Sequence, residues 1–174
     1  MLLSKNFTEE EFLRSETAKL YTLRNDWELP KYKEHAIRFC KDVLQPLRDY
    51  LNLPVKITSG YRSRPVNKKV GGVWNSYHLI GLAADITVPG FTARQLYNKI
   101  LKCLTDDILR HGKLLIPAGK IILEFDAWVH IQYSDSIQCL PEFMIASKVE
   151  GNITRYIGDV AFNKKIREVL LSLR

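Results

Sequence analysis

The stretch Ser76–Asp85, which reads SYHLIGLAAD, organises the chain. It places an imidazole, His78, seven residues before a carboxylate, Asp85. Further along, the sequence EFDAWVH gives a second carboxylate, Glu124, six residues before a second imidazole, His130. Two neutral imidazoles and one carboxylate are a common set of protein ligands for a catalytic zinc ion, and an additional carboxylate can take a proton from water. The pattern therefore predicts a zinc site of the kind used for hydrolysis.

The composition is that of a single globular domain. The chain has 174 residues, of which 46% are hydrophobic and 26% charged, and its formal net charge is +7. Such a charge favours polyanionic partners, whether nucleic acid, an anionic membrane surface or a cell wall. No segment approaches the roughly 20 apolar residues that span a bilayer, and the first residues, MLLSKNFTEEE, lack a secretory signal. We therefore expect synthesis in the cytoplasm and no insertion into a membrane.

Periodicity and capping patterns predict four helices, over residues 9–14, 31–51, 92–104 and 163–173. The first follows a capping box formed by Thr8 and Glu11, and the third follows one formed by Thr92 and Gln95. Pro46 lies inside the second helix and should bend or divide it. Residues 15–30 look irregular, and the pattern weakens after residue 141.

Alternating apolar residues predict short strands over residues 55–59, 83–88, 113–116, 120–125 and 128–133. Residues 61–72 are basic and rich in turn formers, which indicates a loop with one helical turn. Helices followed by a strand-rich centre predict an α+β fold, with a small, mainly antiparallel sheet packed against helices.

Strand alternation tests whether the candidate residues can meet. Successive side chains of a strand point to opposite faces, so Asp85, Glu124 and His130 each lie opposite an apolar face of their own strand. A sheet that packs its apolar face on the helices would present all three from one side. Taken singly, each has an ordinary structural explanation, as a hydrogen-bonded histidine or a carboxylate in a turn or cap.

The joint pattern resembles that of a known family. The motif S-x-H-x-x-G-x-A-x-D, from Ser76 to Asp85, together with E-F-x-x-W-V-H, from Glu124 to His130, is similar to the paired signature of the M15 zinc peptidases. The stretch SGYRS, from Ser59 to Ser63, is similar to the substrate-side motif of the branch common in phages. The resemblance covers roughly residues 7–135. It implies the fold shared by D,D-peptidases and the hedgehog signalling domain.

The resemblance also implies a role for each matching residue. His78, Asp85 and His130 would bind one zinc ion, and Glu124 would act as the base. Arg62, Ser76 and Trp128 would contact the substrate, although a structural arginine and a cap at Ser76 remain open. Asp126 is a rival base, four residues before His130. We assign residues 1–140 to the peptidase domain and residues 141–174 to an extension that packs on that domain or on a partner.

The implied function is a zinc-dependent peptidase that cleaves peptidoglycan stem peptides at a bond involving a D-amino acid. The D,D-carboxypeptidase and L,D-endopeptidase types both remain open. The resemblance suggests a phage-type lysis enzyme or a virion-associated protein that acts at the cell wall. The alternative is a non-catalytic, zinc-containing module of the same fold. A nucleic-acid partner is not expected, because the basic residues are dispersed and no nucleic-acid-binding motif is present.

Overall fold

A computed structural model describes residues 1–134, 140–149 and 153–172. Their helices are α1 (Glu9–Leu13), α2 (Glu16–Leu20), α3 (Pro30–Phe39), η1 (Cys40–Leu44), α4 (Gln45–Leu51), α5 (Arg64–Lys69), η2 (Tyr77–Ile80), α6 (Ala93–His111) and α7 (Val160–Leu171). Their strands are β1 (Lys56–Ser59), β2 (Ala83–Thr87), β3 (Ala118–Glu124), β4 (Trp128–Tyr133), β5 (Glu142–Val149) and β6 (Ile153–Gly158). In the described part of the chain, no helix is both long and apolar enough to cross a membrane.

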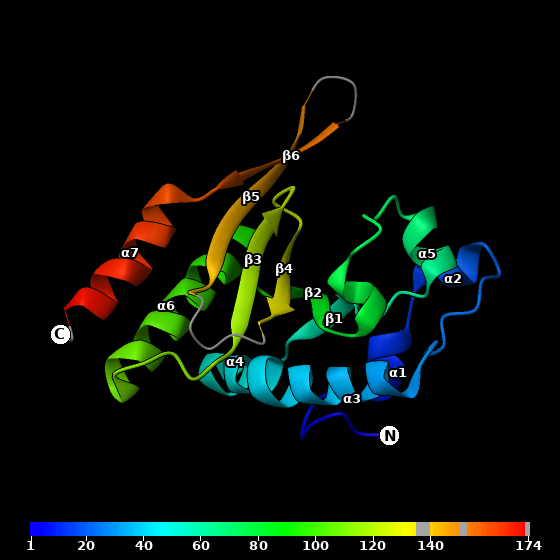
Figure 1. Ribbon diagram of the computed structural model, residues 1–174, viewed down its shortest axis with the longest axis horizontal. Coiled ribbons are helices and arrows are strands. Elements are labelled where there is room, and N and C mark those ends of the chain that lie inside the picture. Colours follow the sequence, from blue (N-terminus) through cyan, green and yellow to red (C-terminus); the bar gives the residue numbers. More distant parts are fainter. Residues whose placement is uncertain (135–139, 150–152, 173–174) are drawn as a thin grey trace.

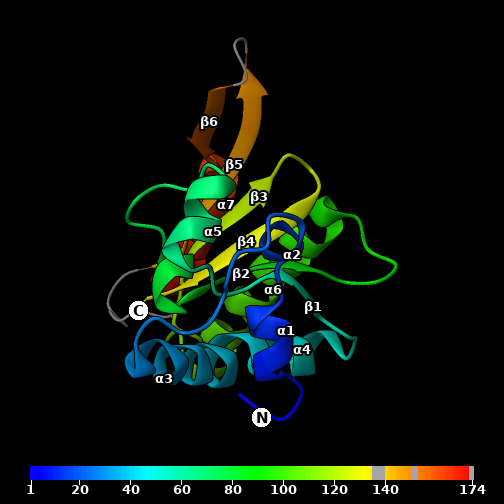
Figure 2. The same ribbon diagram turned by 90° about the vertical axis from the view of Figure 1, so that its right-hand side faces the viewer.

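One mixed sheet holds the molecule together, with strand order β1-β2-β4-β3-β5-β6 (Figure 1). Its neighbouring strands are antiparallel except for β3 and β5, which run parallel. The α+β fold with a mainly antiparallel sheet is therefore confirmed. The outer parts of β5 and β6 rise beyond the other strands (Figure 2).

The two faces of the sheet differ in character. Every second residue of the central strands belongs to the buried core, including Ile86, Leu123 and Ile131. Helix α6 packs against this face at β3 and β4, and α7 packs on α6 (Figure 1). The opposite face carries Asp85 and His130, whose Cα atoms are paired in register. Alternation has therefore separated the apolar core from the polar face, as expected for strands buried on one side.

The long N-terminal helix contains a π-helical turn just before its proline. Pro46 has no N–H to give to the helix, and the preceding residue, Gln45, donates its N–H to the carbonyl of Cys40, five residues back. The run from Pro30 to Leu51 thus stays helical throughout, and the change from π-helix to α-helix falls between Leu44 and Gln45, just before Pro46.

The C-terminal residues belong to the same fold. Phe162 of α7 stacks on Tyr97 of α6 at a centroid distance of 5.1 Å and meets Phe143 of β5 edge-on at 5.6 Å. Helix α7 begins three residues before the predicted start, because Asp159 accepts a hydrogen bond from the N–H of Phe162 and caps it. Leu173, the predicted end, lies outside the described residues.

Two local expectations were wrong, and two strands were missed. Residues 15–30 contain α2, whose first turn is capped by the hydroxyl of Ser15. Residues 113–116 form no strand, because the Asp107 carboxylate accepts hydrogen bonds from the N–H groups of Leu115 and Ile116, at 2.7 and 3.2 Å, and holds them in a loop. The region after residue 141 contains β5 and β6, which the sequence pattern did not reveal.

Candidate metal centre and cleft

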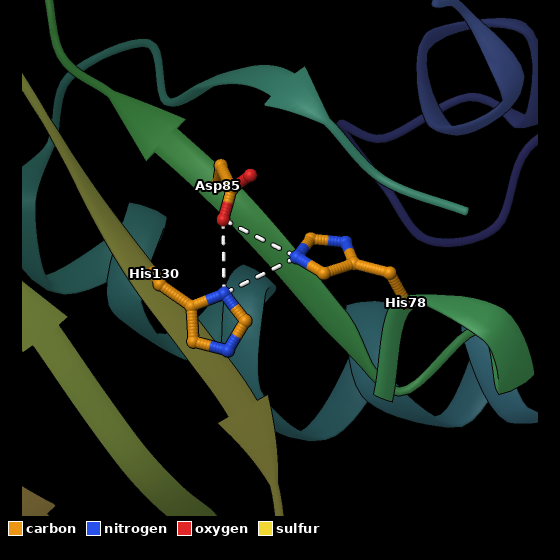
Figure 3. A group of neighbouring side chains, drawn as sticks. All are labelled: His78, Asp85 and His130. Carbon is orange, nitrogen blue, oxygen red and sulfur yellow. Dashed lines mark hydrogen bonds and ion pairs between the residues drawn. The ribbon is translucent and has the colours of Figure 1, made fainter. Parts of the chain in front are cut away.

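Three side chains from separate elements converge on the polar face of the sheet. His78 comes from η2, Asp85 from β2 and His130 from β4, and their candidate ligand atoms all lie within 4.8 Å of one another (Figure 3). All three residues are buried. In the described part of the chain, this is the one group of histidine, cysteine and carboxylate side chains arranged to hold a metal ion.

The local sequence positions His78 through a short turn. The hydroxyl of Ser76 accepts a hydrogen bond from the N–H of His78 at 3.4 Å and caps η2. Gly81 ends η2 in the left-handed region, with φ of 75°. A Cβ atom at Gly81 would lie 2.4 Å from the carbonyl oxygen of Tyr32, so only glycine fits this position. The chain then enters β2, which carries Asp85.

The distances within the group suit a tetrahedral ion. His78 Nε2 lies 3.2 Å from His130 Nδ1 and 3.3 Å from Asp85 Oδ1, and the last two atoms are 2.9 Å apart. Ligands about 2.0–2.1 Å from a tetrahedral zinc ion are separated by about 3.3–3.4 Å. The three atoms are therefore already close to the spacing that such an ion requires.

The proton positions also fit metal binding. His78 Nδ1 lies 2.6 Å from the carbonyl oxygen of Gly60, which can only accept a hydrogen bond. The proton of the imidazole is thus on Nδ1, and Nε2 presents a lone pair to the centre. Burial lowers the pKa of His78, which favours this neutral form. Neutral imidazole is the form that binds zinc.

Arg62 supports one of these ligands. Its guanidinium donates a hydrogen bond to Asp85 Oδ2, the oxygen that faces away from the two histidines. Arg62 Nε donates to the hydroxyl of Ser59 at 2.8 Å. The arrangement leaves Asp85 Oδ1 directed at the centre and fixes the carboxylate plane. A substrate-binding role for Arg62 stays a prediction, and the structure adds this contact with a candidate ligand.

Glu124 lies on the same face as the three candidate ligands, at the end of β3. Its neighbour Ile122 pairs in register with His130, and Glu124 itself pairs with Trp128. Trp128 Nε1 donates a hydrogen bond to Glu124 Oε2 at 3.0 Å. Burial and the charge of Asp85 raise the pKa of Glu124. A carboxyl group with a raised pKa is better suited to exchange protons near neutral pH.

Asp126, the rival base, is placed differently. It lies in the turn between β3 and β4, where both Phe125 and Asp126 have positive φ, of 55° and 52°. Its side chain is 64% exposed and pairs with Arg94 at 3.1 Å. The geometry therefore favours Glu124 over Asp126 as the carboxylate beside the centre.

A cleft of about 980 Å³ opens over this centre. Ser76 and Trp128, both expected to contact the substrate, line it together with Arg62 and Glu124. The sequence analysis missed a second group of lining residues, which come from β3 and the C-terminal strands: Lys120, Met144, Lys148, Thr154 and Tyr156. Alternation within β5 and β6 was the only signal for four of them, and they lie beyond the stretch that carries the resemblance.

A search among curated proteins returned no match. Comparison with protein-family models matches residues 5–132 to the family described as Peptidase M15. The match includes the three candidate ligands, Glu124 and Arg62, but ends before β5. A chain matched over more than two thirds of its length, with the ligand set of a zinc-dependent peptidase gathered in one cleft, belongs to the peptidase M15 family.

Proposed function

We propose that the protein is a zinc-dependent peptidase that hydrolyses stem peptides of peptidoglycan at a bond involving a D-amino acid. The observation that carries the proposal is the position of Glu124, a carboxylate inside the cleft on the same sheet face as His78, Asp85 and His130. A purely structural metal site has no need of such a group.

The residues have distinct tasks in this reaction. His78, Asp85 and His130 would hold one zinc ion, which would supply a Lewis acid to the reaction. Glu124 takes the proton from the attacking water and passes it to the amine that leaves. Trp128 keeps the Glu124 carboxylate oriented through its indole N–H. Arg62 keeps the Asp85 carboxylate aligned through its hydrogen bond to Oδ2.

The substrate is proposed from the resemblance and from charge. The M15 relatives with similar motifs include peptidoglycan carboxypeptidases and phage endopeptidases, and a net charge of +7 favours approach to an anionic wall. We further propose that the protein acts at the cell wall, as a phage-type lysis enzyme or a virion component. Neither the carboxypeptidase nor the endopeptidase type is preferred.

Mass spectrometry of purified stem peptides tests the function. The zinc-loaded protein should release a defined fragment, and the Glu124→Gln variant at equal zinc content should not. A fragment would also identify the bond that is cut. Zinc binding without any cleavage of stem peptides would contradict the proposal and favour a non-catalytic module.

A further inference from the structure

The strands β5 and β6 lie beyond the family match but contribute to the polar face of the sheet, which carries Asp85 and His130. Strand β5 runs parallel to β3, and Glu124 is in register with Ala146. Ala146 is in turn in register with Tyr156 of β6. Because paired residues of neighbouring strands point to the same face, Tyr156 stands on the face of Glu124, two strands away.

Alternation along β6 separates the residues that face the cleft from those that do not. Thr154 and Tyr156 line the cleft, as do Met144 and Lys148 of β5. Ile157, the neighbour of Tyr156, is on the opposite face and pairs with Ile145. The hairpin thus presents one side to the cleft and the other away from it.

Ala146, which lies between Glu124 and Tyr156 in this register, has a small side chain. Ala146 is only 1% exposed although its face is the open one, so the larger side chains around it cover it. Tyr156 is 50% exposed within the wall of the cleft. Its ring is therefore accessible to a ligand that reaches the metal centre.

The Tyr156 hydroxyl has the properties of a hydrogen-bond donor to that ligand. Burial raises the pKa of Tyr156, and the charges of Glu124 and Asp85 raise it further. The phenol is therefore protonated at neutral pH, and its hydroxyl lies within the field of both carboxylates. Within the described part of the chain, no residue forms a hydrogen bond with this hydroxyl.

We infer that Tyr156 contacts the substrate, by donating a hydrogen bond from its hydroxyl to a carbonyl oxygen of a peptide bound at the metal centre. The β5–β6 hairpin then forms the wall of the substrate cleft, on the side of β3 away from His78 and Asp85. The inference rests on the proposed peptidase function. It adds a substrate-binding residue from outside the matched region, while the metal ligands all lie inside it.

The test uses the full-length, zinc-loaded protein and the probe N-acetyl-alanine hydroxamate, which has a metal-binding group and a peptide carbonyl. The Tyr156→Phe variant removes the hydroxyl and keeps the ring. Ile157→Thr is the matched control, because it changes the adjacent, 54% exposed residue on the other face of the same strand. Probe affinity is measured by calorimetry, and zinc affinity by competition with a chelator.

We expect Tyr156→Phe to bind the probe about 3- to 10-fold more weakly, the usual effect of losing one neutral hydrogen bond. Zinc affinity should be unchanged, and Ile157→Thr should bind both as the wild type does. Equal probe affinity in Tyr156→Phe and the wild type would overturn the inference, as would loss of zinc in that variant or failure of the wild type to bind the probe.

A parallel arm separates this inference from the proposed function. Stem peptides that remain intact with the wild-type protein would contradict the proposed substrate. The difference in probe binding between Tyr156→Phe and Ile157→Thr would still support Tyr156 as a contact for a peptide at this centre. If stem peptides are cut, the same 3- to 10-fold loss should appear in kcat/KM.

Discussion

Replacing Arg62 tests how the candidate metal centre is supported. In the structure its guanidinium joins Asp85 Oδ2 to the hydroxyl of Ser59. The side chains of Arg62 and Asp85 are only 16% and 5% exposed, so water can replace little of what Arg62→Ala would remove. We therefore expect the variant to leave Asp85 free to rotate and its second oxygen without its charged partner.

The size of the effect follows from the position of the contact behind a ligand. Loss of a hydrogen-bond partner behind a metal ligand typically costs 10- to 100-fold in metal affinity, which is about 1.4–2.8 kcal/mol. We expect the zinc dissociation constant of Arg62→Ala to rise within that range. Arg62→Lys keeps the charge but cannot bridge Ser59 and Asp85 with one planar group, so its loss should be smaller.

Competition with a chromogenic chelator gives the zinc affinity, and thermal unfolding of the metal-free protein shows whether each variant is folded. Ser59→Ala is the matched control, because it removes only the contact at Nε and should cost less than Arg62→Ala. If Arg62→Ala binds zinc as tightly as the wild type while KM for stem peptides rises, Arg62 acts on the substrate and not through Asp85.

Three further predictions concern the candidate metal centre and its surroundings. Glu124→Gln should retain zinc and lower kcat by about 10²- to 10⁴-fold. Asp126→Asn changes a 64% exposed carboxylate and should stay within about tenfold of wild-type activity, with both variants assayed at equal zinc content. Trp128→Phe removes a hydrogen bond that lowers the pKa of Glu124, so the pKa of Glu124 should rise. The acid limb of the pH profile of kcat/KM should then move to higher pH, and an unmoved limb would show that another group controls it. Gly81→Ala should destabilise the fold by at least about 2 kcal/mol in urea denaturation, because φ is 75° and the new methyl group would clash with the Tyr32 carbonyl oxygen. If the variant is as stable as the wild type, η2 can rearrange.

Local signals predicted much of the fold. The capping boxes at Thr8 and Thr92 are both formed, with Glu11 and Gln95 as their partners. These motifs are decided within one turn of helix, so the sequence alone contains the necessary information. Helix α6 nevertheless runs well beyond the expected end, to His111, and stops where Gly112 takes up φ of 70°.

The candidate site was predictable to the same extent. The resemblance implied that His78, Asp85 and His130 form a ligand set, and the structure brings them together. Strand alternation placed Glu124 on the side of Asp85 and His130, in agreement with the register. The contact between Arg62 and Asp85 depends on how the loop after β1 meets β2, which no short-range pattern encodes.

The C-terminal wall was not predictable for a related reason. Strand β5 pairs in parallel with β3 and not with a strand joined to it by a tight turn, so no hairpin signal links the two. The side chain of Tyr156 could be placed near Glu124 only once both registers were known. Long-range pairing therefore determined the part of the cleft that the sequence left open.

The parallel pairing of β5 with β3 also has a consequence for solubility. Without β5, one edge of β3 would present unpaired N–H and C=O groups along a strand that includes Ile121 and Leu123, and such an edge can recruit strands from other molecules. β5 covers that edge. β6 in turn pairs with β5, is the outermost strand on this side of the sheet and carries Arg155. Charged residues on an edge strand discourage intermolecular pairing. The C-terminal hairpin thus covers an edge of β3 that could otherwise pair with other molecules, in addition to lining the cleft.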